Sequence, residues 1–452
     1  MQVIHAAQAL LPGGWAREVR VEIDDGRIAQ VTPGAAPDGQ RVGLLTPAPV
    51  NVHSHAFQRA MAGLAERRGP SRDSFWTWRE LMYRFLERLT PEEVEAIAGF
   101  VQMEMLEAGF GASVEFHYLH HAPGGAPYDD RAEMCARIAA AAATSGAGLT
   151  LLPVLYRFGG CDRRPLAGGQ RRFGNDPQGF ARLMEGAARA VAALPDDAVL
   201  GAAPHSLRAV APADLGLCAT LAGDGPVHMH LAEQVAEVEE VEAALGARPV
   251  RWVLENAAPS PRWCFVHCTQ MTPDETEGLA RSGAVAGLCP LTEASLGDGT
   301  FDGVRWSSAG GALAVGSDSN IRISLAEELR QLETSQRLRD RSRAALATPD
   351  RSTGRRLMED AGRGGAQAAG RPAGAIAPGL WADLLALDAT HPDLAGLDGD
   401  TALDAFAMAG GSEMVADVWS AGRHVVTGGR HVRRDAIARR YREAVAGLRA
   451  AL

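Results

Sequence analysis

The segment PVNVHSH, residues 49–55, opens with the first of eight short apolar runs that end near polar or charged residues. Stretches of helical pattern separate these runs, which is typical of βα units around a parallel sheet. Eight parallel strands predict a closed (β/α)8 barrel of the TIM type, an α/β fold. The eight runs are 49–53, 111–116, 148–156, 199–205, 226–232, 262–267, 284–290 and 313–319.

Both ends of the chain lie outside this pattern, and both have the character of strands and turns. Residues 1–48 read as strands and turns, including an Asp25-Gly26 hairpin signal, and strand character returns at 374–388 and 417–429. We therefore expect a small β-sandwich domain built from both ends, with the Gly- and Ala-rich stretch 361–378 as the most linker-like piece. The predicted domains are 1–48 for the first part of the β-domain, 49–373 for the barrel, and 374–452 for the rest of the β-domain plus a terminal helix.

A well-marked helix is predicted to start after Thr90. Thr90 can cap it, Pro91 suits its first turn, and Glu93 completes a capping box. Apolar residues recur along it at helical spacing, from Val94 to Met105, and this stripe is expected to be core.

The composition of the chain limits the kinds of molecule that it is expected to bind. The chain has 452 residues, of which 46% are hydrophobic, and a formal net charge of -10 without a basic run. This charge argues against nucleic acid or an anionic membrane as the main partner, so we expect a small-molecule substrate. No apolar stretch reaches the roughly 18 residues of a membrane span, and the N-terminal segment does not resemble a secretion signal, so we expect a cytoplasmic protein.

Cysteine and lysine usage excludes further chemistry. The six cysteines form no CxxC pair, so we expect reduced core residues rather than disulfides or a zinc knuckle. Every long basic side chain is Arg, since the sequence contains no Lys. This excludes Schiff-base catalysis, Walker-type phosphate binding and a two-metal site bridged by a carboxylated lysine.

Histidines and acids stand at the ends of several predicted strands, where barrel enzymes place their active sites. His53 and His55 are two residues apart on an extended segment, so both can face one metal ion. His230 is followed three residues later by Glu233, which could transfer protons. His228 shares the face of His230, and the spacing leaves open which of the two binds metal.

Two further strand ends complete the pattern. His267 closes the run 262–267, where either a catalytic role or simple packing would fit. Asp318 ends an apolar strand, where a buried carboxylate needs a cation or another partner, although it could instead cap the helix expected after Ser324. The set resembles the single-metal branch of the amidohydrolase superfamily.

Longer motifs resemble one family within it, the formimidoylglutamate deiminases, over about residues 45–325. These enzymes hydrolyse N-formimino-L-glutamate to N-formyl-L-glutamate and ammonia in histidine degradation. The matching segments are NVHSHAFQRAMAGLAE (51–66), DSFWTWRELMYRF (73–85), SVEFHYLHH (113–121), APHSLRAV (203–210), HMHLAEQ (228–234), VHCTQMT (266–272) and CPLTEASLGDGTF (289–301).

The resemblance implies a role for each matching residue and makes His228 an interior residue of the barrel. It implies one zinc ion per chain, held by His53, His55, His230 and Asp318. It implies catalytic roles around the hydrolytic water for Glu233, His267 and Asp318. It implies substrate binding by Gln58, Arg79, Tyr118, His205 and Arg208.

Arg79 and Arg208 are the expected anchors for the substrate's carboxylates, because a guanidinium binds a carboxylate in a bidentate manner. Without the resemblance, a solvated or packing role would be the ordinary interpretation of either arginine. Two other functions stay open: a single-metal deaminase of a purine, pyrimidine or related ring, and a barrel that binds without turnover. We also expect a homodimer.

Overall fold

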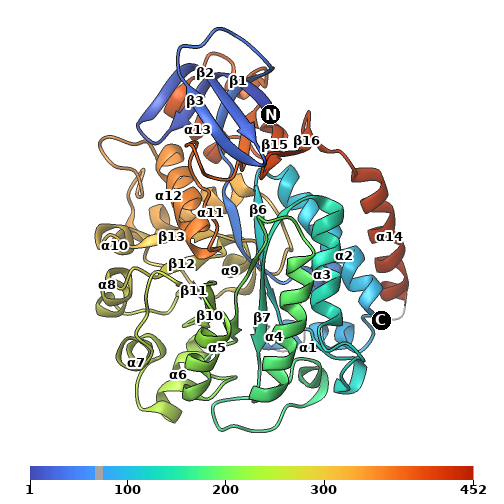
Figure 1. Cartoon of the computed structure of the whole chain (residues 1–452). Helices are drawn as coiled ribbons and strands as arrows, with labels where there is room; N and C mark the ends of the chain where they lie inside the picture. The colour runs from blue at the N-terminus through green and yellow to red at the C-terminus, as the bar shows by residue number, and fades with distance from the viewer. Residues whose placement is uncertain (67–74, 451–452) are drawn as a thin grey trace.

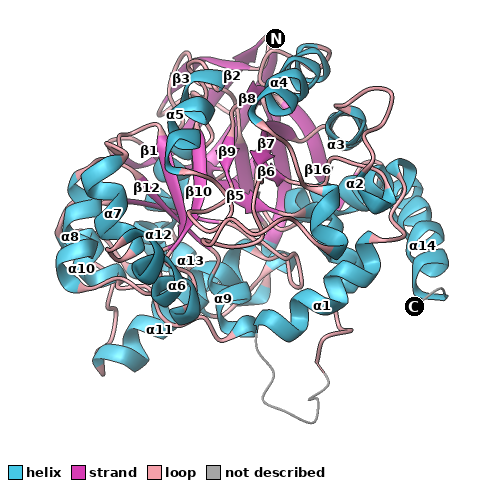
Figure 2. Ribbon diagram, turned by 90° about the horizontal axis from the view of Figure 1, so that it is seen from below, coloured by secondary structure: helices cyan, strands magenta, loops and turns pink. Residues whose placement is uncertain are grey.

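The computed structural model describes residues 1–66 and 75–450, with the side chains of all of them except 75–80. A barrel of parallel strands occupies the centre, and helices surround it (Figures 1 and 2). The barrel strands are β5 (Val50–Ser54), β6 (Ala112–His117), β7 (Gly148–Leu155), β8 (Val199–Leu200) with β9 (Ala203–Pro204), β10 (Val227–Leu231), β11 (Trp263–His267), β12 (Val285–Leu288) and β13 (Ala312–Val315).

Two bridges close these strands into a ring. Strands β5 to β9 form one parallel sheet and β10 to β13 another. Parallel bridges join the sheets between Ala202 and Val227 on one side and between Ser54 and Asp318 on the other. The predicted (β/α)8 barrel is therefore confirmed, and each of the eight apolar runs contains a strand.

The helices lie between and after the strands. The connecting helices are α1 (Phe75–Leu86), α2 (Pro91–Glu107), α3 (Glu133–Ser145), α4 (Pro177–Ala192), α5 (Pro212–Leu221), α6 (Val235–Leu245), α7 (Pro249–Asn256), α8 (Pro273–Arg281), α9 (Pro290–Leu296), α10 (Gly303–Ser308), α11 (Leu325–Asp340) and α12 (Thr353–Ala368). Within residues 1–66 and 75–450, none of the helices has the length and apolar character needed to cross a membrane.

The capped helix after Thr90 is present as predicted. The Thr90 side chain accepts a hydrogen bond from the backbone of Glu93, and the Glu93 carboxylate accepts one from the backbone of Thr90 at 2.9 Å. Its expected apolar stripe, from Val94 to Met105, is buried. The terminal helix α14 (Arg434–Ala450) packs against it, with the rings of Phe100 and Tyr441 stacked at 3.9 Å.

An eight-stranded sheet unites strands from both parts of the chain and lies at the top of Figure 1, whereas α14 runs from it down the side of the barrel to the C-terminus. The ends meet where β4 pairs antiparallel with β14, with Leu45 opposite Ala386. One face of the sheet encloses a core of its own, and the other joins the barrel core. In order, its strands are β17 (Arg430–His431), β16 (Arg423–Thr427), β15 (Val415–Ser420), β14 (Leu384–Leu387), β4 (Gln40–Pro47), β1 (Gln2–Leu11), β2 (Gly14–Asp24) and β3 (Arg27–Thr32).

The linker interpretation of residues 361–378 is wrong, because α12 occupies the first part of this stretch and is largely buried. Its glycines allow close packing instead of flexibility. A Cβ at Gly364 would lie 2.7 Å from the backbone carbonyl carbon of Leu313 in β13, and one at Gly365 would lie 3.2 Å from the backbone of Val50 in β5. The helix α13 (Gly399–Met408) has no counterpart among the predicted elements.

A buried ion network ties the β-domain to the barrel. Arg371 donates to Asp383 at 2.6 Å and to Asp197 at 2.8 Å, and Arg423 also binds Asp197 at 2.7 Å. Burial alone would raise the pKa of Asp197, but the hydrogen bonds and charges of Arg423 and Arg371 outweigh it and lower that pKa.

Candidate active site

His53 and His55 lie where β5 leaves its regular pairing with β6. The register shifts between Asn51 and Ser54, and this irregularity brings both rings to one side, with their Nε2 atoms 3.1 Å apart. Nδ1 of His55 is 2.9 Å from the carbonyl oxygen of Phe116. Because a carbonyl only accepts, that nitrogen carries the proton and Nε2 presents its lone pair to the cluster.

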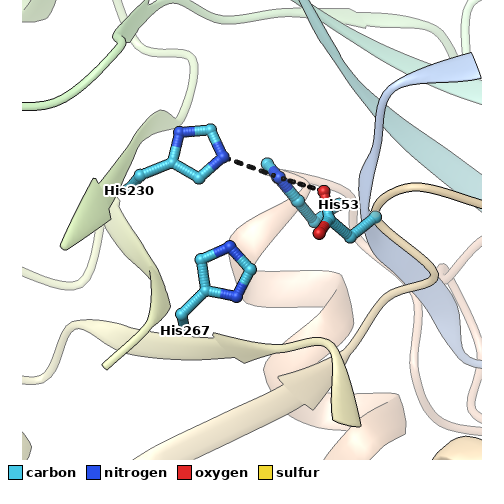
Figure 3. Close-up of side chains that lie close together, drawn as sticks. His53, His230 and His267 are labelled. Atoms are coloured by element: carbon cyan, nitrogen blue, oxygen red, sulfur yellow. Dashed lines mark hydrogen bonds and ion pairs between the residues drawn. The ribbon is translucent and has the colours of Figure 1, made fainter. Parts of the chain in front are cut away.

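His230, at the end of β10, repeats the arrangement. Its Nδ1 donates to the carbonyl of His205 at 3.1 Å, and its Nε2 lies 3.1 Å from Nε2 of His53. Figure 3 shows the rings of His53, His230 and His267 turned toward a common region. Asp318 adds a carboxylate oxygen, which is 3.2 Å from Nε2 of His55 and 3.4 Å from Nε2 of His53.

These donor atoms fit a metal ion. One ligand atom from each of His53, His230, His267 and Asp318 lies within 4.8 Å of the others. Atoms bound at about 2.0–2.1 Å to a tetrahedral zinc ion would be roughly 3.3 Å apart, close to the spacings observed here. His55 and His230 each turn a lone pair toward His53, whose Nε2 can satisfy only one of them with a proton, so a cation accounts for the arrangement better than hydrogen bonds do.

Burial keeps the ring nitrogens in the form that metals require. The pKa of His53 is lowered to about 3, and burial is the largest cause. Burial also lowers the pKa of His55 and of His230. Neutral imidazoles can bind a metal, whereas imidazolium ions cannot. Nδ1 of His53 is buried with no hydrogen-bond partner among the described residues, so no hydrogen bond through that nitrogen holds the ring.

Glu233 and His267 form an acidic and basic pair beside these donors. Oε1 of Glu233 lies 3.8 Å from Nε2 of His267, and Nδ1 of His267 lies 3.2 Å from Oε1 of Glu293. Burial raises the pKa of Glu233 to about 7, against the opposing charge of His267. Burial lowers the pKa of His267, but the charges of Glu233 and Glu293 outweigh it and raise that pKa to about 10.

The backbone is strained at the ends of the strands that carry these groups. Ala232, His267 and Asp318 have φ values of 52°, 73° and 45°, in the left-handed region that residues other than glycine seldom adopt. Such a conformation costs on the order of 1–3 kcal/mol per residue and is typical of functional sites. Here it turns the chain sharply at the mouth of the barrel.

A cavity adjoins the donor cluster and encloses about 550 Å³, including the space at its open mouth. Four of the five predicted substrate residues line it together with His55, His230 and Asp318: Gln58, Tyr118, His205 and Arg208. The fifth, Arg79, falls in α1, but its side chain lies outside the described residues. Gln58 Nε2 donates to the hydroxyl of Tyr118 at 2.6 Å, which fixes both side chains at the wall.

Arg208 supplies a positive charge to this wall. The residue is 7% exposed. Burial opposes its charge, but Glu237, Tyr156 and Glu233 more than compensate and raise its pKa, so it is a cation. His205, which lines the same cavity, faces Tyr156, and the centroids of the two rings are 4.5 Å apart.

The structure also places the residues whose roles the spacing left open. His228 bonds through Nε2 to the carbonyl oxygen of Ala368 at 2.7 Å, and only His230 reaches the cluster. Ser324 caps α11 by accepting from Glu327, so Asp318 is not the cap of that helix. His267 faces the cluster instead of only packing in the core.

Several residues of the site carry little signal in the sequence. Tyr156 ends a predicted strand run and could have been selected on that ground. Phe173 lies in a loop without a periodic pattern, so it could not have been selected from the sequence. Glu293 follows β12 in a motif without predicted chemistry, yet its carboxylate contacts His267 and also accepts from the backbone of Cys289 at 2.8 Å.

Comparisons with known proteins agree with this geometry. A model of the amidohydrolase family matches residues 44–425, and a model described as the N-terminal domain of formimidoylglutamate deiminase HutF matches residues 1–41. A curated formimidoylglutamate deiminase from Pseudomonas aeruginosa is 49% identical over 446 residues, which cover 98% of each chain.

Solved structures give the same result. An amidohydrolase from Brucella melitensis is 49% identical and superposes with a TM-score of 0.95 over 99% of this chain and 100% of that one. An adenosine deaminase from Xanthomonas campestris with bound zinc, at 23% identity, has a TM-score of 0.82 over 99% and 98% of the two chains, and shows the shared fold alone. The resemblance found in the sequence motifs is thus confirmed, and the chain belongs to the amidohydrolase family as a metal-binding hydrolase related to the formimidoylglutamate deiminases.

Proposed function

We propose that this chain hydrolyses N-formimino-L-glutamate to N-formyl-L-glutamate and ammonia in histidine degradation, with one zinc ion per chain. The observation that carries the proposal is a single cavity that joins a cluster of metal-binding donors to a buried cation, Arg208. The donors suit hydrolysis, and the cation suits an acidic substrate.

The zinc ligands in this proposal are His53, His55, His230 and Asp318. Bound zinc would lower the pKa of its water toward about 7, so that hydroxide is available at neutral pH. His267 is placed beside the water instead of among the ligands, because its two ring nitrogens face the carboxylates of Glu293 and Glu233. The short spacings among His53, His55 and Asp318 support this assignment.

Proton transfers are assigned to the acidic and basic groups beside these ligands. Asp318 accepts a proton from the attacking water, which His267 orients, while the water oxygen adds to the carbon of the protonated formimino group. Glu233 then donates a proton from its carboxyl group to the departing nitrogen, and the carbon–nitrogen bond breaks. The hydroxyl group of the intermediate becomes the formyl carbonyl and returns a proton to the Glu233 carboxylate, and ammonia leaves. Burial raises the pKa of Glu233, which favours the protonated carboxyl group that this role requires.

Substrate binding is assigned to the cavity wall. Arg208 would bind one carboxylate of the glutamate skeleton through two parallel hydrogen bonds. Gln58, Tyr118 and His205 would hold the rest of the skeleton, and Arg79 is proposed for the other carboxylate from the resemblance alone. The partner is therefore a small anionic molecule.

Ammonia release from N-formimino-L-glutamate tests the function directly. We expect turnover that stops on dialysis against a chelator and returns with zinc. Turnover that persists after complete metal removal would contradict the proposal. Purified protein without stoichiometric metal would instead favour a barrel that binds without turnover.

Arg208→Met separates the proposal from the alternative of a ring deaminase. It should raise the KM for the acidic substrate strongly and change that for a neutral purine or pyrimidine little. Arg157→Met is the matched control, because Arg157 is paired with Asp214 at 2.8 Å and is not among the residues that line the cavity in the described part of the chain. An unchanged KM in Arg208→Met would remove the argument for an acidic substrate.

The expected homodimer is also part of the proposal. Light scattering during size-exclusion chromatography should give about twice the chain mass of 47.7 kDa. The boundaries 1–48, 49–373 and 374–452 stay predictions, which limited proteolysis can check.

A further inference from the structure

A second cluster of possible metal ligands lies near the end of β6. His117 ends β6, His120 follows in the next loop, and Cys135 belongs to α3. One donor atom from each lies within 4.8 Å of the others. The side chains are 1%, 0% and 0% exposed, respectively.

Each histidine of this cluster has at least one buried ring nitrogen without a hydrogen-bond partner of normal geometry in the described part of the chain. Neither ring nitrogen of His117 makes a hydrogen bond of normal geometry among the described residues, and only a weaker backbone contact with Leu119 opposes the effect of burial on its pKa. Burial lowers the pKa of His117 to about 3, so the ring is neutral and one of its nitrogens carries a lone pair. A buried polar atom without a partner is unfavourable, and a metal ion would give this lone pair one.

His120 has the orientation that metal-binding histidines show. Its Nε2 donates to the carbonyl oxygen of Val154 at 2.9 Å, so its Nδ1 carries a lone pair, and this atom has no hydrogen-bond partner in the described part of the chain. A ring held through one nitrogen by a backbone carbonyl, with the other nitrogen available, is the usual arrangement at metal centres.

Cys135 completes the donor set with sulfur. Its thiol is free of any disulfide in the described part of the chain. Two imidazole nitrogens with one thiolate form a set that binds zinc(II) and also copper(I), the thiophilic ions of biology. Cys135 is reduced and buried, as the sequence predicts, and the proposal below gives its sulfur a further role.

We propose that His117, His120 and Cys135 form a second metal site, structural in role, for a thiophilic ion that is bound in addition to the single catalytic zinc ion of the proposed function. On binding, Cys135 releases its proton to solvent and its thiolate cancels one positive charge of the ion. Copper(I) would then be neutralised completely, whereas zinc(II) would keep one charge and take a fourth ligand such as water.

The burial of all three side chains makes a role in substrate turnover unsuitable for this site. Its position gives it a structural effect instead. His117 directly follows Phe116, whose ring packs against His230 at a centroid distance of 4.5 Å and whose carbonyl orients His55. An ion that ties the end of β6 to α3 would hold the backbone that positions these two proposed zinc ligands.

Metal analysis of the full chain tests the proposal, with Cys218→Ser as a matched control because Cys218 is equally buried but lies in α5. We expect two metal equivalents in the wild type, one fewer in Cys135→Ser and no loss in Cys218→Ser. Elemental analysis identifies the lost equivalent as zinc or copper. Equal metal content in Cys135→Ser and the wild type would overturn the proposal.

Cobalt substitution tests the same site without relying on that variant to fold. Protein produced in cobalt-supplemented medium should show a near-ultraviolet thiolate-to-cobalt charge-transfer band, which His117→Gln should abolish. Cys289→Ser should keep the band, which excludes the sulfur that lies near His267. Absence of the band from the wild type, or its loss in Cys289→Ser, would refute the assignment.

The two proposals fail separately. The ligands proposed at the mouth of the barrel contain no sulfur, so the cobalt–thiolate band does not depend on them. Ammonia release without the band would leave the proposed function intact, and the band without ammonia release would leave the second site intact.

Discussion

Gly364→Ala probes the contact between α12 and the barrel. The added Cβ would lie 2.7 Å from the carbonyl carbon of Leu313 and still closer to its oxygen, whereas ordinary contact starts at 3.4 Å. The obstacle is the backbone of a barrel strand, which cannot rotate away as a side chain can. We therefore expect a loss near the upper end of the usual cost of overpacking, about 3 kcal/mol.

Gly99→Ala is the control for this change. Gly99 lies inside α2, and a Cβ there would meet no described atom within 4 Å outside its own helix. Replacing a glycine inside a helix by alanine should then stabilise the protein by roughly 0.5–1 kcal/mol. The same chemical change is thus expected to have opposite signs at the two positions.

Thermal unfolding and metal content measure the effect. Gly364→Ala should melt below the wild type and Gly99→Ala at or above it. Because α12 lies against β13 and β5, the strands that lead to Asp318 and His53, Gly364→Ala should also retain less metal at the mouth of the barrel. A Gly364→Ala protein that melts at or above the wild type would show that the packing argument is wrong.

Three further changes have defined outcomes. Glu233→Gln should keep its metal but lose about 10²-fold or more in kcat, since the proton for the departing nitrogen is removed; near-normal kcat would exclude that role. Tyr118→Phe should raise KM about 3- to 10-fold, the value of one hydrogen bond, with metal content unchanged, and an unaltered KM would remove Tyr118 from the binding site. Asp197, whose pKa Arg423 and Arg371 lower on folding, contributes stability above about pH 4 that is lost as the pH falls through its folded pKa. Urea unfolding should therefore show a deficit for Asp197→Asn at pH 7 that shrinks near pH 3, and an equal deficit at both would contradict this linkage.

The barrel and the ends of its strands could be predicted because each strand has a sequence pattern that is contained within its own short segment. A buried parallel strand is apolar on both faces, so each run is visible without knowledge of its neighbours. His53, His230 and Asp318 could be selected because a polar or charged side chain at the end of a buried apolar strand requires a partner such as a metal ion.

Other features depend on contacts between distant segments and leave no such signal. The glycines of α12 suggest a linker until Leu313 and Val50 are seen beside them. The choice between His228 and His230 depends on where Ala368 lies. Phe173 reaches the cavity from a loop, where periodicity carries no information.

The bridge between Ser54 and Asp318 has a consequence for biosynthesis. The backbone of Asp318 donates to the carbonyl of His53 and accepts from the amide of His55, both at 2.9 Å, so the pairing that completes the ring also brings the aspartate to the two histidines. A nascent chain on the ribosome cannot form this donor set until its last barrel strand has emerged. Binding of the proposed metal is thereby delayed until the polypeptide has joined the beginning of its barrel to the end.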